Sequence, residues 1–206
     1  MKKIYLLSLC LFFSSSLLLS QQVPVSDLKK SVHAAQLKNG ILLVLLPNSD
    51  KKIETLRNQG KEKLANIEEE EVNLTRSELV EAFDKEYTFG RFYFIEAETL
   101  KEILAGEFTN VLDSNLDKVQ QFPAGQNLYL ARYGPGNPNG EHYKYNGIGL
   151  QIRYINNNQV ETIKYDMFYA AYRKFRISNF FKKKRRGKLD LVEEINTRLH
   201  NVKIKS

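Results

Sequence analysis

The stretch that decides the fold reads Lys38-Asn39-Gly40-Ile41-Leu42-Leu43-Val44-Leu45-Leu46-Pro47. Lys38-Asn39-Gly40 is a turn signal, and Pro47 stops the apolar run because proline has no N–H to give to a strand. A short, uninterrupted apolar run between two such signals is typical of a strand that is buried on both faces. We therefore predict a central strand over residues 41–46.

A long helical connection follows this strand. Asn48-Ser49-Asp50 can cap a helix that begins near Lys51, and Gly60 weakens or ends that helix. A second helical stretch is predicted over residues 61–87, and it carries two apolar stripes. The capping-box pattern Thr75-Arg76-Ser77-Glu78 predicts that the helix restarts inside this stretch.

A second strand at 91–95 completes a strand–helix–strand unit, whose two strands are normally parallel with a right-handed crossover. Periodicity and turn signals then predict a series of shorter elements. These are a helix at 98–104, strands at 108–112, 127–133, 148–154 and 160–165, and a helix at 189–202. The order predicts an α/β (α+β) fold: a mixed sheet that starts with a βαβ unit, continues as antiparallel strands and ends with a C-terminal helix.

The chain begins with the layout of a secretory signal peptide. Met1-Lys2-Lys3 is basic, Ile4–Leu19 is almost wholly apolar, and polar residues follow Ser20. The apolar run is shorter than the about 20 residues of a membrane span, although an uncleaved anchor is the alternative. We expect a signal peptide at 1–20, cleavage near Ser20, a linker at 21–36 and a single α/β domain at 37–206. The protein would then be exported, either periplasmic or secreted.

Cys10 is the only cysteine, and it lies inside the predicted signal. Cys10 is not expected to be the lipidated cysteine of a lipoprotein, because Leu9 precedes it at a position that requires a small residue. After cleavage the chain would hold no disulfide, thiolate nucleophile or cysteine ligand. A thioredoxin-like arrangement is compatible with the predicted element order, but without Cys-x-x-C it could not carry out thiol chemistry.

Charge is divided between the two halves of the chain. Residues 21–126 hold 13 basic and 18 acidic side chains, a net charge of −5, and residues 127–206 hold 16 basic and 6 acidic ones, a net charge of +10. Much of the positive charge lies in one segment, residues 172–188, which we call the basic aromatic segment. Its nine cations are Arg173, Lys174, Arg176, Lys182, Lys183, Lys184, Arg185, Arg186 and Lys188.

The basic aromatic segment is the best candidate for a binding surface. Clustered cations beside Phe175, Phe180 and Phe181 suit an anionic membrane surface or lipopolysaccharide, because rings enter the interface and cations meet the headgroups. The alternative is that the rings belong to the core and the cations are merely solvated. Clustered cations are also typical of proteins that bind nucleic acid. An exported protein rarely meets nucleic acid, so we expect no nucleic-acid partner.

Sequence motifs for catalysis, cofactors and metals are absent. The chain has no Gly-x-Ser-x-Gly, no phosphate-binding glycine loop and no His-Glu-x-x-His, and His33, His142 and His200 are far apart in sequence. We expect neither a cofactor nor a metal site, and a non-enzymatic binding or structural module. The alternative is a hydrolase whose site forms only in three dimensions near Glu141-His142-Tyr143-Lys144-Tyr145, after a glycine- and proline-rich loop.

The stretch 37–47, followed by Lys52-Ile53-Glu54-Thr55-Leu56, resembles small uncharacterised exported proteins of Gram-negative bacteria. The resemblance implies an exported α/β domain of the bacterial envelope. It implies no activity and no functional residues.

Overall fold

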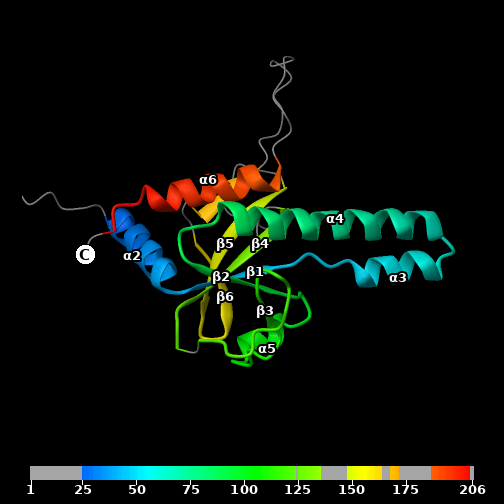
Figure 1. Ribbon diagram of the computed structural model, residues 1–206, viewed down its shortest axis with the longest axis horizontal. Helices are drawn as coiled ribbons and strands as arrows, with labels where there is room; N and C mark the ends of the chain where they lie inside the picture. The colour runs from blue at the N-terminus through cyan, green and yellow to red at the C-terminus, as the bar shows by residue number, and fades with distance from the viewer. Residues whose placement is uncertain (1–24, 124, 136–147, 164–167, 172–186, 205–206) are drawn as a thin grey trace, which may run out of the picture.

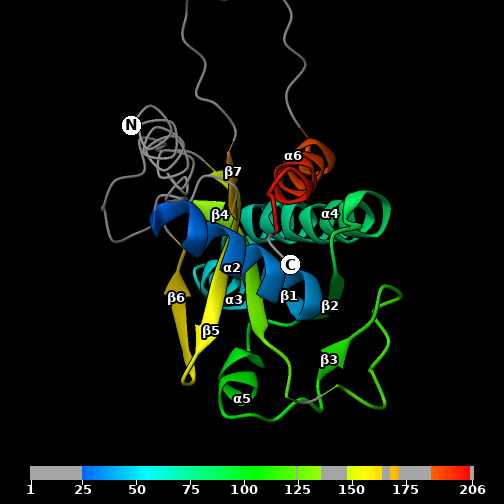
Figure 2. The same ribbon diagram turned by 90° about the vertical axis from the view of Figure 1, so that its left-hand side faces the viewer.

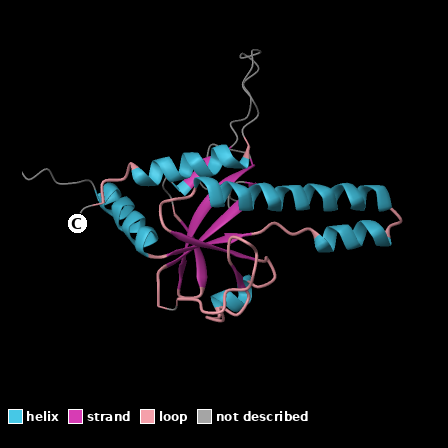
Figure 3. Ribbon diagram, in the orientation of Figure 1, coloured by secondary structure: helices cyan, strands magenta, loops and turns pink. Residues whose placement is uncertain are grey.

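A computed structural model describes residues 25–123, 125–135, 148–163, 168–171 and 187–204. The described part mixes helices and strands in its first half, continues as a run of strands and ends with a helix (Figure 1; Figure 3). Its helices are α2 (Val25–Asn39), α3 (Asp50–Asn58), α4 (Glu62–Glu86), α5 (Leu100–Leu104) and α6 (Lys188–His200). Its strands are β1 (Ile41–Leu45), β2 (Arg91–Ile95), β3 (Val111–Leu112), β4 (Leu128–Pro135), β5 (Ile148–Asn156), β6 (Gln159–Thr162) and β7 (Tyr169–Ala171).

All of these strands join one mixed sheet, so the predicted α/β fold is confirmed. The strand order is β3-β2-β1-β4-β5-β6, and β7 pairs with the start of β5. β1 lies in the middle and is parallel to both β2 and β4, as the βαβ prediction required for β1 and β2. The remaining pairs, β2 with β3, β4 with β5, and β5 with β6 and β7, are antiparallel.

β1 is buried on both faces, which explains its unbroken apolar sequence. Leu42 and Val44 belong to a core shared with α2, α4 and α6, whereas Ile41 and Leu43 belong to a second core beside α5. This alternation follows from the period of two along a strand. The sheet is therefore a central layer with α4 and α6 on one face and α5 on the other (Figure 2).

The connection from β1 to β2 is longer than the strands that it joins. α4 has 25 residues and thus a length of about 37 Å, while the five residues of β1 span about 17 Å. α3 and α4 consequently project past the sheet as a helical hairpin (Figure 1). Ile53 and Ala65 are buried in the hairpin, and Lys52 donates to Glu68 at 2.5 Å across it.

α4 differs from the sequence prediction in two ways. It is continuous through residues 75–78, so the predicted restart is wrong, and Ser77 instead donates to the Leu74 carbonyl within the helix. Leu64, Ile67 and Leu74 are also exposed, by 52%, 43% and 58%, so the first predicted apolar stripe does not pack into a core.

Residues 25–36 form most of α2, so the expected linker is wrong for its described part. Ala34 and Leu37 have no exposed surface and pack into the helix-side core. The chain then turns tightly at Gly40, where a Cβ atom would lie 2.4 Å from the Asn127 carbonyl oxygen and 2.6 Å from that of Gln36. This close approach allows Ile41 N to donate to Asn127 O at 2.9 Å, which starts the β1–β4 pairing.

The later strands and the last helix follow the prediction closely. β5 and β6 form a hairpin around Asn157 and Asn158, whose φ angles of 46° and 62° are typical of a type I′ turn. α6 begins and ends within two residues of the predicted helix at 189–202. β7 is a strand that the sequence did not predict. In the described part, no helix is long and apolar enough to cross a membrane.

Candidate functional site

The carboxyl edge of the parallel strands is the best candidate for a functional site. The chain leaves β1 for β2 on one side and returns to β4 on the other, so the strand order reverses between β1 and β4. In α/β sheets, ligands generally bind outside the carboxyl ends of strands at such a point. β1 ends at Leu45, opposite Arg132 of β4, whereas β4 continues and pairs only with β5.

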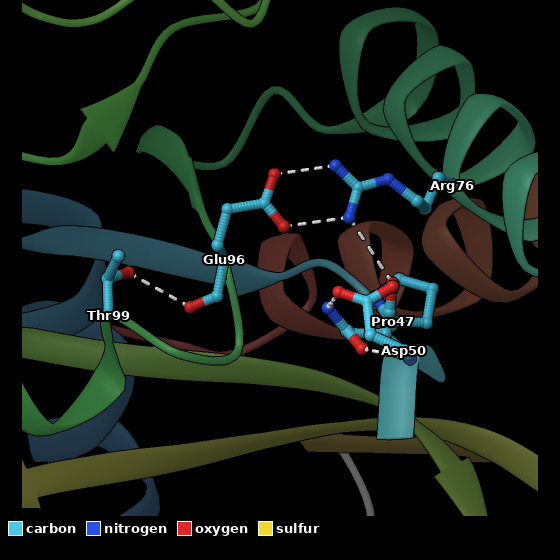
Figure 4. Close-up of polar contacts among 6 residues, drawn as sticks. Pro47, Asp50, Arg76, Glu96 and Thr99 are labelled. Carbon is cyan, nitrogen blue, oxygen red and sulfur yellow. Dashed lines mark hydrogen bonds and ion pairs between the residues drawn. The ribbon is translucent and has the colours of Figure 1, made fainter. Parts of the chain in front are cut away.

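One half of this edge is closed by an arginine–glutamate pair (Figure 4). Arg76 of α4 donates from Nη1 and Nη2 to the two carboxylate oxygens of Glu96, at 2.7 and 2.5 Å, just after β2. Its Nη1 also donates to the Pro47 carbonyl at 3.3 Å, just after β1. Hydrogen bonding to Glu96 raises the pKa of Arg76, so the guanidinium stays charged. Arg76 therefore fastens α4 to the ends of two strands.

Short turns support that pair. Asp50 N donates to Asn48 Oδ1 at 2.7 Å, which shapes the entry to α3, and Thr99 Oγ1 donates to the Glu96 carbonyl at 2.9 Å. Because the Arg76 and Glu96 charges satisfy one another, this pair stabilises the fold and is not itself a free acid or base.

The other half of the edge is cationic. Arg132 of β4 lies opposite Gln151 of β5, and Arg153 is on the same face two residues further along β5, away from this edge and opposite Leu130. Arg153 donates from Nε and Nη2 to Gln151 Oε1, at 3.1 and 2.9 Å. Both arginines are half-buried, and Gln151 is only 7% exposed. Burial, together with the charge of Arg132, lowers the pKa of Arg153.

Most of the residues predicted from the sequence lie outside the described residues. This holds for eight cations of the basic aromatic segment, 173 to 186, and for the whole cluster 141–145. Lys188 is described: it opens α6, forms an ion pair with Glu78 of α4, and its Nζ lies 5.6 Å from the centroid of the Tyr133 ring. Its side chain is 15% exposed, so it anchors α6 to α4.

The two described histidines pack against aromatic side chains. His33 Nδ1 lies 3.2 Å from the Tyr129 hydroxyl, and its ring meets Tyr154 and Phe168 edge-on. His200 stacks edge-on against Phe89 at the end of α6. Among the described residues, no group of three or more histidine, cysteine or acidic side chains could hold a metal ion.

Sequence reasoning did not single out the pair Arg132 and Arg153. The alternating pattern at 148–154 placed Gln151 and Arg153 together on one strand face, which is the signal that was available.

Comparison with known proteins adds no further guide, because no protein-family model, curated protein or solved structure matches the chain.

Proposed function

We propose that the protein is an exported, non-enzymatic binding module of the bacterial envelope, and that its basic aromatic segment associates with anionic phospholipid or lipopolysaccharide. One observation carries the proposal: residues 172–186 hold eight cations and no carboxylate in a single connection between two described elements. A dense cationic run beside aromatic rings is typical of segments that bind anionic interfaces.

The attachment of the segment at both ends supports the proposal. Ala171 ends β7, which pairs with β5, and Gly187 precedes α6, whose Lys188 is paired with Glu78. The basic run is thus a connection within the chain and not a tail. Holding both ends lowers the conformational entropy that the segment loses when it settles on a surface.

The expected strength follows from the number of charges. Each basic residue near an anionic membrane contributes about 1 kcal/mol, so engaging half of the eight cations would give about 4 kcal/mol. That corresponds to a dissociation constant of about 1 mM before the aromatic contribution is added. Such binding depends on ionic strength, because salt screens exposed charges over about 10 Å at 0.1 M.

The test is co-sedimentation of the protein lacking residues 1–20 with vesicles of phosphatidylglycerol and phosphatidylethanolamine across a sodium chloride series. We expect binding at low salt that a variant with Lys182, Lys183, Lys184, Arg185 and Arg186 changed to Gln loses. A matched control changes five exposed cations elsewhere to Gln, namely Lys29, Lys38, Lys51, Lys61 and Lys63. The control loses the same charge and should keep binding. Absence of low-salt binding by the unsubstituted protein would overturn the proposal.

Export is tested separately by expressing the full chain in a Gram-negative host and determining the N-terminus of the protein in the periplasmic fraction. We expect it to begin at Gln21, because the predicted cleavage follows Ser20. Recovery of the chain only in the cytoplasm would contradict export, and retention of residues 1–20 in the membrane fraction would favour the uncleaved anchor.

A further inference from the structure

We propose that Arg132, Gln151 and Arg153 form a binding site for a phosphate group at the carboxyl edge of the sheet, separate from the basic aromatic segment. The phosphate would be free or part of a larger ligand such as a lipid headgroup. The proposal starts from strand register, because β4 and β5 bring together two arginines that are 21 positions apart.

The register places both guanidinium groups on one face within reach of a common ligand. Arg132 is paired directly with Gln151, so Arg153 is its diagonal neighbour across the β4–β5 ladder. Diagonal neighbours are separated by about 7–8 Å, a distance that two long side chains can bridge. A phosphate between them could accept hydrogen bonds from both arginines.

The cations have no acidic partner in the described part of the chain. Arg132 forms no hydrogen bond or ion pair there, and Arg153 bonds only to the neutral Gln151. On β1 the residue paired with Arg132 is the apolar Leu45. Glu161 belongs to the other face, where its carboxylate accepts from Asn156 at 2.9 Å. Two half-buried like charges repel one another, and a bound dianion would remove that repulsion.

Free donors remain to hold the anion. An arginine has five N–H groups, and Arg153 uses two of them on Gln151, which fixes the plane of its guanidinium. Within the described residues, three donors of Arg153 and all five of Arg132 have no protein partner. Arginine forks match phosphate oxygens in bidentate geometry, and a phosphate carries a charge of about −1.5 to −2 at pH 7, which suits two cations.

The sheet also leaves space beside Arg132. Gly134 is paired with Gly149 two pairs beyond Arg132 and Gln151, on the side away from Arg153, so two positions on the same face as Arg132 carry no side chain. No atom lies within 4 Å of where a Cβ atom of Gly134 would be, so the position is open. Gly134 therefore leaves room beside Arg132, on the side away from Arg153, for an oxyanion to reach the Arg132 guanidinium.

The test is a thermal-unfolding titration of the signal-free protein with inorganic phosphate, against sodium chloride at the same ionic strength. We expect phosphate to raise the melting temperature and Arg132→Gln to weaken the apparent affinity by about tenfold or more. Without phosphate, Arg132→Gln should be as stable as the unsubstituted protein or more so, since it relieves repulsion from Arg153. A merely structural Arg132 would instead lower the stability of the phosphate-free protein.

Two further variants make the outcome specific. Arg132→Lys keeps the charge and should retain part of the phosphate effect. The fivefold Gln variant of residues 182–186 should keep the whole effect, which separates this site from the basic aromatic segment. The proposal would be overturned if phosphate raised the melting temperature of Arg132→Gln as much as that of the unsubstituted protein, or raised neither. Neither outcome would affect the vesicle result.

Discussion

At the scale of single residues, Tyr87 is the clearest weakness of the core. It is 4% exposed, and its hydroxyl has no hydrogen-bond partner among the described residues. Burial raises its pKa, so the hydroxyl stays neutral. Because an unsatisfied buried hydroxyl costs about 1–3 kcal/mol, we expect Tyr87→Phe to raise the free energy of unfolding by about 1 kcal/mol in urea titrations.

Tyr129 is the matched control for that change. It is also buried, but its hydroxyl donates to the His33 carbonyl at 3.1 Å and lies 3.3 Å from Gln36 Oε1. Tyr129→Phe removes hydrogen bonds that are made, so it should lower the free energy of unfolding by about 1 kcal/mol. A loss of stability in Tyr87→Phe equal to that in Tyr129→Phe would show that the Tyr87 hydroxyl has a partner.

His33 gives the protein a pH dependence with a definite sign. Burial lowers its pKa, and the charge of Glu161 only partly opposes this effect. The unfolded state therefore takes up a proton at a higher pH than the folded state, so stability falls as pH drops below about 6.5. We expect His33→Gln to lose less stability than the unsubstituted protein between pH 7 and pH 5. An identical loss in both would exclude His33 as the source.

At the scale of elements, α4 combines a structural half and an exposed half. Leu79 is 1% exposed in the helix-side core, and Leu74, five residues away, is 58% exposed. Leu79→Ala should therefore lower the free energy of unfolding by about 2–5 kcal/mol. Leu74→Ala should stay within about 0.5 kcal/mol, as surface substitutions usually do. A large effect of Leu74→Ala in monomeric protein would mean that another part of the chain covers this face.

The elements also show where sequence patterns succeed. β2 has the predicted bounds and β1 lies inside the predicted run, because a strand in the middle of a sheet needs an apolar run and turn residues set its ends. α2 was missed because its apolar residues form no single strong stripe, and its burial depends on packing of Ala34 and Leu37 into the helix-side core. The exposure of Leu64 and Leu74 was missed because an apolar stripe does not reveal whether a helix outruns its sheet.

At the scale of the whole molecule, the sheet creates neighbours that local patterns cannot reveal. The sequence predicts Arg132 and Arg153 on separate strands, but only the register of β4 and β5 makes them a pair. The segregation of charge, in contrast, is visible in the sequence alone, because it depends on counting and not on contacts. The basic aromatic segment could thus be proposed from the sequence, whereas the arginine pair required the fold.

The central claim is that residues 172–188 are the surface that meets the anionic envelope, and lysine footprinting tests it most directly. The signal-free protein is acetylated at low salt with and without phosphatidylglycerol vesicles, and each lysine is quantified by mass spectrometry. Lys182, Lys183 and Lys184 should become protected by vesicles, while the exposed Lys51 and Lys63 of the α3–α4 hairpin keep their reactivity. Protection of Lys51 and Lys63 with unchanged reactivity at 182–184 would contradict the account.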